Sequence, residues 1–200
     1  MVHSIGKDKS SVNGNKMTTS RENLLEAAIL YIANHGLSDM SLRELASEIG
    51  TSHRMIIYHF GSRQGLVAAI VESMERQQRD ALAQIAQNNT TTRDVIEAQW
   101  AHLSDPAMRP FVCLFFEVLS LALHERPGTE SFVASMTTPW LDLGDKIVQQ
   151  LGLQTRRDDV RLGVAVVRGL LIEVAATGDL AAPTASLNRF LDLLDAHAIQ

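Results

Sequence analysis

Residues 41–60, SLRELASEIGTSHRMIIYHF, constrain the fold more than any other part of the chain. Ser41 and Glu44 have the S-x-x-E spacing of a capping box, in which two side chains satisfy free N–H groups at a helix start. Apolar residues then recur at helical spacing as far as Ile49, and Gly50 follows, where a sharp turn can use glycine's access to positive φ. The segment therefore predicts two short helices joined by a tight turn.

The second of these helices presents a polar face. Thr51 or Ser52 can cap it, and Ile56 and Phe60, four residues apart, face inward. A helix-turn-helix of this layout places its second helix in the DNA major groove, where Arg binds guanine edges and Tyr or His donates to phosphates. An ordinary helical hairpin with a polar surface is the alternative that these residues alone leave open. The side chains expected to point outward are those of His53, Arg54, Met55, Tyr58 and His59.

The stretch from Arg21 to Leu66 closely resembles the DNA-binding domain of TetR-type (tetracycline-repressor family) regulators. RENLLEAAILYIANHG resembles the first helix with its final glycine, SLRELASEIGTS the second helix and turn, and YHFGSRQGL the end of the recognition helix and the start of the fourth. By this resemblance, and by their residue types, the DNA-contacting residues are expected to be Ser41, Arg43, Thr51, Ser52, His53, Arg54, Met55, Tyr58, His59 and Arg63.

Three positions depart from the family pattern. Arg54 stands where the family often has glycine, which suggests an altered base preference or docking depth. Ile57 replaces a tyrosine and removes one phosphate contact, although Tyr58 follows at once. Arg63 replaces the usual lysine, and either cation can meet a phosphate near that helix start, where the helix dipole assists.

Composition agrees with a cytoplasmic regulator rather than a secreted or membrane protein. We find no run of about 18 apolar residues, no apolar signal-peptide core, and one cysteine, Cys113, so no intrachain disulfide can form. The net charge is −5, but residues 1–66 carry seven Lys and Arg against six Asp and Glu, while residues 67–200 carry eleven against seventeen. The weak field of the first part predicts modest non-specific DNA affinity, with specificity carried by a few contacts.

The rest of the chain predicts an all-α protein of about nine helices. Residues 1–18 are polar and are expected to be a disordered tail, either without a role or forming a lysine-bearing arm along DNA. Residues 19–66 are expected to form a three-helix DNA-binding domain, and residues 67–200 a helical effector-binding and dimerisation domain. One helix is predicted over 129–151, with a kink at Pro139.

The last two helices carry the strongest dimerisation signal. Residues 161–178, RLGVAVVRGLLIEVAATG, are apolar around most of the helix, which must therefore be covered on more than one side. Packing within the chain is one explanation; we favour a four-helix bundle between two copies, as the resemblance also implies. The residues expected at this interface are Val160, Val164, Val167, Leu171, Leu187, Phe190, Leu191 and Leu194.

The middle helices combine large apolar residues with a few polar ones, which is typical of a small-molecule pocket. Plain core packing is the alternative, and Glu117, which interrupts LFFEVL, needs a partner such as Arg168 or a bound cation. The predicted pocket residues are Trp100, Met108, Phe111, Phe115, Glu117, Met136, Trp140 and Arg168.

These features predict a dimeric, sequence-specific regulator of double-stranded DNA, a repressor that leaves a palindromic operator when a small-molecule effector binds. The alternative is a ligand-independent DNA-binding or adaptor protein with a filled core. No Gly-rich phosphate loop, H-E-x-x-H, G-x-S-x-G or C-x-x-C motif occurs, so an enzyme, a metal site and a cofactor are not expected.

Overall fold

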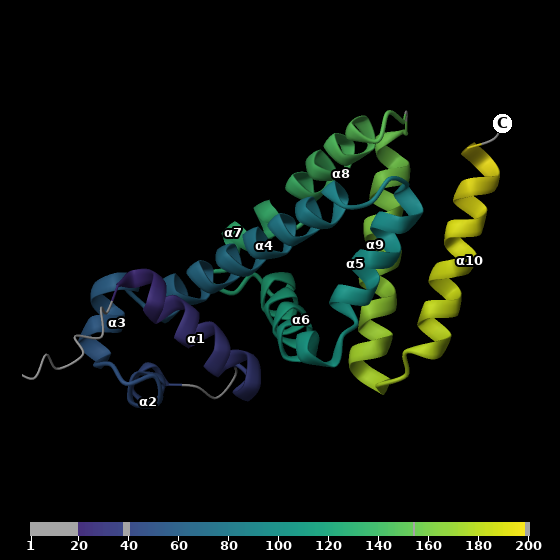
Figure 1. The fold of residues 1–200 in the computed structure, drawn as a ribbon. Coiled ribbons are helices and arrows are strands. Elements are labelled where there is room, and N and C mark those ends of the chain that lie inside the picture. The colour runs from purple at the N-terminus through teal and green to yellow at the C-terminus, as the bar shows by residue number, and fades with distance from the viewer. Residues whose placement is uncertain (1–19, 38–40, 154, 199–200) are drawn as a thin grey trace, which may run out of the picture.

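The computed structural model describes residues 20–37, 41–153 and 155–198. Within these residues every regular element is a helix, which confirms the all-α prediction. The tail predicted over 1–18 lies outside the described residues. Figure 1 shows the helix-turn-helix at one end of the molecule and the last two helices at the other, with the long α4 running between them. The helices are α1 (Arg21–His35), α2 (Leu42–Glu48), α3 (His53–Phe60), α4 (Arg63–Gln87), α5 (Thr92–Leu103), η1 (Pro106–Met108, a 3₁₀ turn), α6 (Arg109–Leu123), α7 (Glu130–Ser135), α8 (Thr138–Gln150), α9 (Arg157–Thr177) and α10 (Ala181–Ala198).

A serine side chain caps the N-terminus of each of the first four helices. Ser41 accepts a hydrogen bond from the Glu44 N–H at 3.1 Å, which confirms the predicted cap of α2. Ser52, rather than Thr51, caps α3 by accepting from the Met55 N–H at 3.2 Å. Between the two helices Gly50 adopts φ +69°, a conformation that glycine adopts without strain. The sharp turn predicted from the sequence is therefore present.

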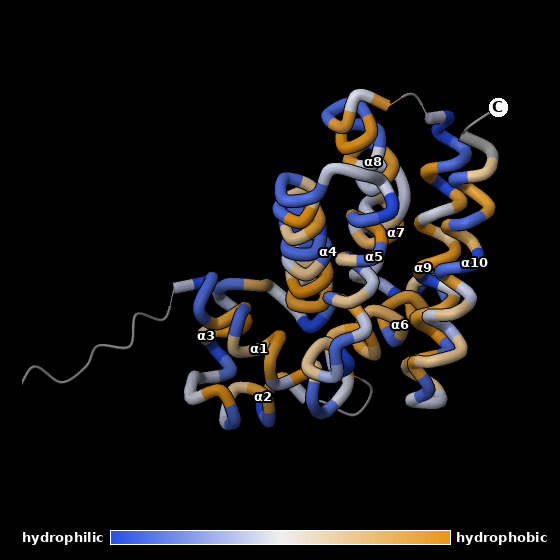
Figure 2. The backbone as a smooth tube through the Cα atoms, turned by 45° about the vertical axis from the view of Figure 1, so that its right-hand side comes forward, coloured by the Kyte–Doolittle hydropathy of each residue, from blue (hydrophilic) through white to orange (hydrophobic). Residues whose placement is uncertain are grey.

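The core of the helix-turn-helix continues into the second half of the chain. Ile56 and Phe60 of α3 are buried, as their spacing predicted, in a cluster that also contains Leu114 and Val118 of α6 and Phe132 of α7. Because α4 runs without a break through residues 66 and 67, no linker separates the two predicted domains, and their division remains a prediction. Figure 2 shows hydrophobic and hydrophilic residues alternating along α1, α3 and α4.

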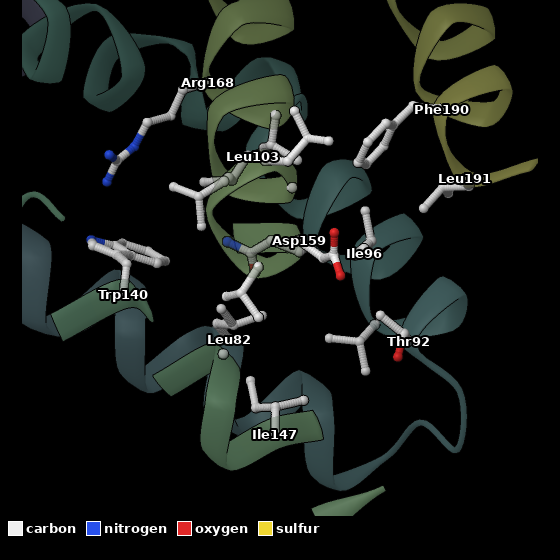
Figure 3. Close-up of a pocket in the computed structure, with 18 of the residues that line it drawn as sticks. Leu82, Thr92, Ile96, Leu103, Trp140, Ile147, Asp159, Arg168, Phe190 and Leu191 are labelled. Carbon is white, nitrogen blue, oxygen red and sulfur yellow. The ribbon is translucent and has the colours of Figure 1, made fainter. Parts of the chain in front are cut away.

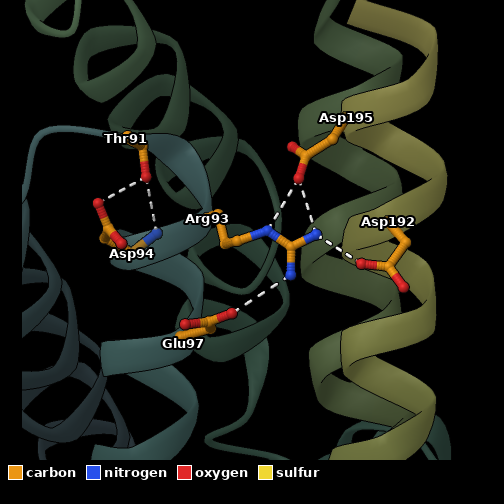
Figure 4. Close-up of polar contacts among 6 residues, drawn as sticks. All are labelled: Thr91, Arg93, Asp94, Glu97, Asp192 and Asp195. Carbon is orange, nitrogen blue, oxygen red and sulfur yellow. Dashed lines mark hydrogen bonds and ion pairs between the residues drawn. The ribbon is translucent and has the colours of Figure 1, made fainter.

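A second apolar cluster joins α5, α6, α9 and α10. Trp100, Val112 and Leu171 are buried in it together with Leu187 and Leu191 of α10. An ion-pair cluster on the surface reinforces the packing of α10. Arg93 of α5 contacts Asp192 at 2.8 Å and Asp195 at 2.7 Å, and also reaches Glu97, as Figure 4 shows.

Two segments differ from the sequence-based expectations. The helix predicted over 129–151 is divided into α7 and α8, because Pro139 lies in the first turn of α8, where its missing N–H leaves no helical bond unmade. Residues Pro106–Leu123 are long and apolar enough, by length and composition alone, to cross a membrane. In this structure α6 instead packs between the two apolar clusters and carries Glu117.

Candidate functional site

Four side chains form the exposed face of α3. His53, Arg54, Ile57 and Tyr58 all point away from the core, and Tyr58 is 77% exposed. Arg54 therefore presents its guanidinium to solvent, as its spacing predicted. Ile57 was treated in the sequence only as a lost tyrosine, yet its exposed side chain can make apolar contact with a thymine methyl group.

Two residues that the sequence placed outward are half-buried instead. Met55 packs against the first apolar cluster, and His59 has its Nε2 buried without a hydrogen-bond partner among the described residues. Both precede an inward residue, Ile56 or Phe60, by one position. At about 100° per residue, they fall on the flank of the helix rather than on its outer face.

The other predicted DNA contacts lie around this face. Ser41, Arg43 and Ser52 are exposed, and Thr51 is half-buried in the turn. Ser41 and Ser52 use their oxygens as acceptors in helix caps, but a hydroxyl that accepts can also donate its own hydrogen. Arg63 is half-buried, and its Nη2 donates to the Leu37 carbonyl oxygen at 2.6 Å. One of its guanidinium N–H donors is therefore already used within the chain.

Glu117 lies outside the cavity and holds the backbone of Leu37, two residues after the end of α1. The Leu37 N–H donates to both Glu117 carboxylate oxygens, at 2.9 Å and 3.0 Å. The carbonyl of the same residue accepts the bond from Arg63. Leu37 is thus attached to α6 through its N–H and to the start of α4 through its C=O. The expected pairing of Glu117 with Arg168 is replaced by this contact with a backbone 80 residues away, which no local pattern reveals.

A cavity of ≈ 1290 Å³ lies between α4, α5, α6, α8, α9 and α10. Five of the predicted pocket residues line it: Met108, Phe111, Phe115, Trp140 and Arg168. Figure 3 shows Arg168 and Trp140 together on one side of this space, with Ile96, Phe190 and Leu191 across from them.

Three predicted pocket residues lie elsewhere. Trp100 is buried in the second cluster, and its Nε1 donates to Thr184 at 2.9 Å. Met136 packs against the first cluster, and Glu117 holds Leu37. Large residues at helical spacing fill cores as well as pockets, so the sequence did not separate Trp100 and Met136 from the true lining.

The sequence missed two buried polar residues in the lining, Glu75 and Gln99. Glu75 of α4 is 4% exposed, and its Oε2 accepts from Trp140 Nε1 at 2.5 Å and from Arg79 Nη1 at 3.3 Å. Burial raises the pKa of the Glu75 carboxyl, while the Trp140 hydrogen bond, Arg168 and Arg79 act to lower it. Each of the two residues follows a buried apolar residue by four positions, Val71 and Val95 respectively, and this interruption of an apolar stripe is the signal that could have found them.

The stripe predicted as the dimer interface faces its own chain. Leu171, Leu187 and Leu191 are buried in the second cluster. The other five residues are half-buried and line the cavity from α9 and α10: Val160, Val164, Val167, Phe190 and Leu194. Another face of α9 is exposed and carries Ala165, Gly169, Ile172 and Ala176, together with Leu162, which also lies at the edge of the cavity. Because α9 is apolar around most of its circumference, periodicity alone did not show which face the chain itself would cover.

Comparison with known proteins agrees with this geometry. The model of the family "Bacterial regulatory proteins, tetR family" matches residues 24–70, which span α1 to the beginning of α4. HTH-type transcriptional repressor AcnR of Corynebacterium diphtheriae is 24% identical over 92% of this chain and 94% of its own. HTH-type transcriptional regulator BetI of Paraburkholderia phymatum is 24% identical over 87% of this chain and 92% of its own.

Solved structures share the fold over most of the chain. A TetR-family regulator from Rhodococcus sp. superposes with a TM-score of 0.72 at 18% identity, over 86% of this chain and 96% of that one. A TetR regulator from Legionella pneumophila superposes with a TM-score of 0.69 at 19% identity, over 90% and 98%. The family match covers the helix-turn-helix itself, and the relatives are regulators rather than enzymes. This chain is a DNA-binding transcriptional regulator, and its residues 24–70 form a helix-turn-helix domain of the TetR type.

Proposed function

We propose that this regulator is a homodimeric repressor that binds a palindromic operator and leaves it when a small molecule enters the cavity. One observation carries the proposal: a single helix, α6, serves both the cavity and the helix-turn-helix. Its Phe111 and Phe115 line the cavity, and Glu117, half a turn further on, holds Leu37 beside the DNA-binding helices. The repressor name of the AcnR relatives supports the direction of control.

Operator recognition is assigned to the exposed face of α3. Arg54 reads a base edge, Tyr58 donates its hydroxyl to a phosphate, and Ile57 adds an apolar contact in the groove. Ser41, Arg43, Ser52 and His53 contact the backbone nearby. Since the net charge of the whole chain is −5, these contacts rather than a broad positive field supply the affinity.

Dimerisation is assigned to the exposed face of α9 and the adjoining side of α10. Leu162 and Ile172 are about half exposed, and Ala165, Gly169 and Ala176 lie between and beside them. Small residues let two helices approach closely, while the two large apolar ones gain from being covered. Two copies joined here present two α3 helices to one face of the DNA, about one helical turn apart.

Effector release follows from a shift between two arrangements of the dimer. A ligand that fits the cavity better in one arrangement of α6 favours that arrangement by its differential affinity. Movement of α6 moves Glu117, and with it Leu37 and, through Arg63, the start of α4. The spacing of the two α3 helices then no longer matches the operator. We place this activity in the cytoplasm, in contact with the chromosome.

The alternative, a ligand-independent DNA-binding or adaptor protein, predicts no ligand-sized cavity near Trp100, Phe115 and Trp140. The ≈ 1290 Å³ cavity between these helices argues against it. Ligand pockets of about 300–1,000 Å³ are usual, so this space is ample for an effector.

The test is selection of bound sequences from a random duplex DNA library, using the purified full-length chain. We expect an enriched palindrome whose half-sites are about 10 base pairs apart, centre to centre. The selected duplex then serves as the probe for release by small molecules. Absence of any enriched motif at low salt would overturn the operator assignment, and an asymmetric single half-site would overturn the dimeric one.

A further inference from the structure

The half-buried Arg168 lines the cavity without an ion pair to any described residue, and this indicates what kind of ligand the cavity takes. We propose that the effector is an organic carboxylate with an apolar body, whose carboxylate is bound by the guanidinium of Arg168. The inference rests on the proposed function, since it names the chemical class of the effector for the same cavity.

Glu75 and Arg168, two of the six charged residues that line the cavity, differ in how they are satisfied. Glu75 already accepts hydrogen bonds from Trp140 and Arg79, and the Glu75–Arg79 ion pair balances its charge at 3.3 Å. Arg168 forms no hydrogen bond or ion pair with any residue in the described part of the chain. Glu75 is near enough to raise the pKa of Arg168, but burial lowers that pKa by more. The other charged residues of the lining pair with each other, Arg93 with Asp195 and Arg156 with Asp159, so Arg168 is the cation of the lining that has no ion pair among the described residues.

Aromatic rings fix the Arg168 guanidinium in place. Its Cζ lies 5.6 Å from the centroid of the Phe115 ring and 5.7 Å from that of Trp140. Trp140 is itself held by its hydrogen bond to Glu75, so the chain Glu75–Trp140–Arg168 fixes the cation from three helices, α4, α8 and α9. A planar guanidinium stacked on its faces keeps its N–H donors at the edge, where a carboxylate binds with two parallel hydrogen bonds.

The same contacts disfavour a cationic ligand. A cation would need the aromatic faces or the Glu75 carboxylate, because these are the groups that attract positive charge. Arg168 already lies over the rings of Phe115 and Trp140, and Arg79 and Trp140 already contact Oε2 of Glu75. A bound cation would also lie beside an unpaired guanidinium, which repels it.

A second polar group in the lining points to a ligand as well. Gln99 of α5 is 6% exposed, and neither its Nε2 nor its Oε1 has a hydrogen-bond partner among the described residues. Burying an amide without partners is costly, so a ligand group that accepts from and donates to Gln99 recovers that free energy. Most of the remaining lining is apolar and includes Phe111, Val112 and Leu171. The ligand therefore has an apolar body, a carboxylate at Arg168 and a smaller polar group at Gln99.

Binding is measured by tryptophan fluorescence and by the rise in melting temperature, with probes that share an apolar body. The first set is decanoate, 1-decanol and decylammonium; the second is 2-naphthoate, 2-naphthol and 2-naphthylmethylammonium. We expect a carboxylate of at least one set to bind roughly 10- to 100-fold more tightly than its neutral and cationic counterparts, as for a charge-assisted hydrogen bond. Tighter binding of the ammonium probes, or no preference within either set, would overturn the inference, as would failure of both carboxylates to bind.

Variants locate the contact. Arg168→Gln should remove the carboxylate preference while leaving the weaker binding of the neutral probe unchanged. Arg161→Gln, on the exposed side of the same helix, is the matched control and should retain it. Should Arg168→Gln fail to fold by circular dichroism, Arg168→Lys keeps the charge without the fork and should lose part of the preference. An unchanged preference in the folded Arg168 variant would overturn the assignment.

Release of the selected operator, followed by fluorescence anisotropy, separates this inference from the proposed function. Arg168-dependent carboxylate binding without operator release would support the ligand class and overturn effector release. Operator release by the ammonium or neutral probes, with no role for Arg168, would support effector release and overturn the ligand class. Carboxylate-driven release that Arg168→Gln abolishes supports both.

Discussion

Two aspartate substitutions on the last two helices separate the core of the chain from its proposed dimer interface. Leu191 is 1% exposed in the second cluster, whereas Ile172 is 52% exposed on the outer face of α9. Removing a buried leucine costs about 2–5 kcal/mol, and an unpaired carboxylate in its place adds a desolvation cost. Leu191→Asp should therefore lower the free energy of unfolding by about 4 kcal/mol or more, a large share of a typical 5–15 kcal/mol.

Ile172→Asp should act on association instead. A substitution at a half-exposed site usually changes the stability of one chain by less than about 0.5 kcal/mol. At a two-fold interface the same change occurs in both copies and brings two carboxylates into one apolar contact. A loss of about 2 kcal/mol per copy corresponds to a roughly thousandfold weaker dimer.

Sedimentation velocity over a concentration series and thermal unfolding by circular dichroism measure the two quantities on the same samples. Leu123→Asp is the matched control, since Leu123 is 76% exposed at the end of α6, away from α9 and α10. It should leave both quantities at their wild-type values. A dimer of wild-type affinity in Ile172→Asp would refute the interface, and a stable, folded monomer in Leu191→Asp would show that the buried stripe, not the exposed one, joins the two copies.

Four further changes test the DNA-binding face, the coupling and the cavity. Arg54→Ala should alter the selected operator at one position, by about 1–3 kcal/mol of discrimination, and an identical binding-site profile would contradict base readout. Tyr58→Phe should weaken binding by about 1 kcal/mol on every sequence, measured by anisotropy; a sequence-selective loss would contradict the phosphate assignment. Glu117→Ala removes both acceptors of the Leu37 N–H, so it should reduce unfolding free energy by about 1–3 kcal/mol and make operator affinity insensitive to bound ligand. Because burial raises the folded-state pKa of Glu75, its ionisation opposes folding at neutral pH, and this penalty disappears below the ordinary glutamate pKa of about 4.3. Glu75→Gln should therefore raise the melting temperature at pH 7 but not at pH 4; an equal gain at both values would rule out ionisation as the cause.

Local signals in the sequence predicted the helix-turn-helix well. The caps at Ser41 and Ser52, the turn at Gly50 and the inward pair Ile56 and Phe60 each depend on residues within four positions of one another. In a helix of eight residues, the two buried side chains also indicate which residues lie on the opposite, exposed side, and His53, Arg54 and Tyr58 do lie there. The misplaced Met55 and His59 flank that buried pair, where period counting gives no sharp answer.

Contacts between distant parts of the chain could not be predicted from the sequence. The bond between Leu37 and Glu117 spans 80 positions, and a carboxylate inside an apolar helix does not say which partner it meets. The same limit applies to α9, whose two apolar faces look alike until α5 and α10 cover one of them. The burial of Glu75 could have been predicted, because a glutamate four residues after the apolar Val71 lies on the same face of the helix.

The apolar character of α6 has a reason that its sequence alone does not give. One side of the helix packs into the core of the helix-turn-helix, another lines the cavity, and Glu117 holds Leu37. A charge-assisted hydrogen bond contributes about 1.5–3 kcal/mol, which is close to the 1–3 kcal/mol typical of coupling between two sites. A ligand can release Leu37 only if its affinities for the two arrangements differ by more than this contact contributes. A much stronger contact would keep the regulator on DNA whatever the cavity held, and a much weaker one would let α6 move without moving the DNA-binding helices.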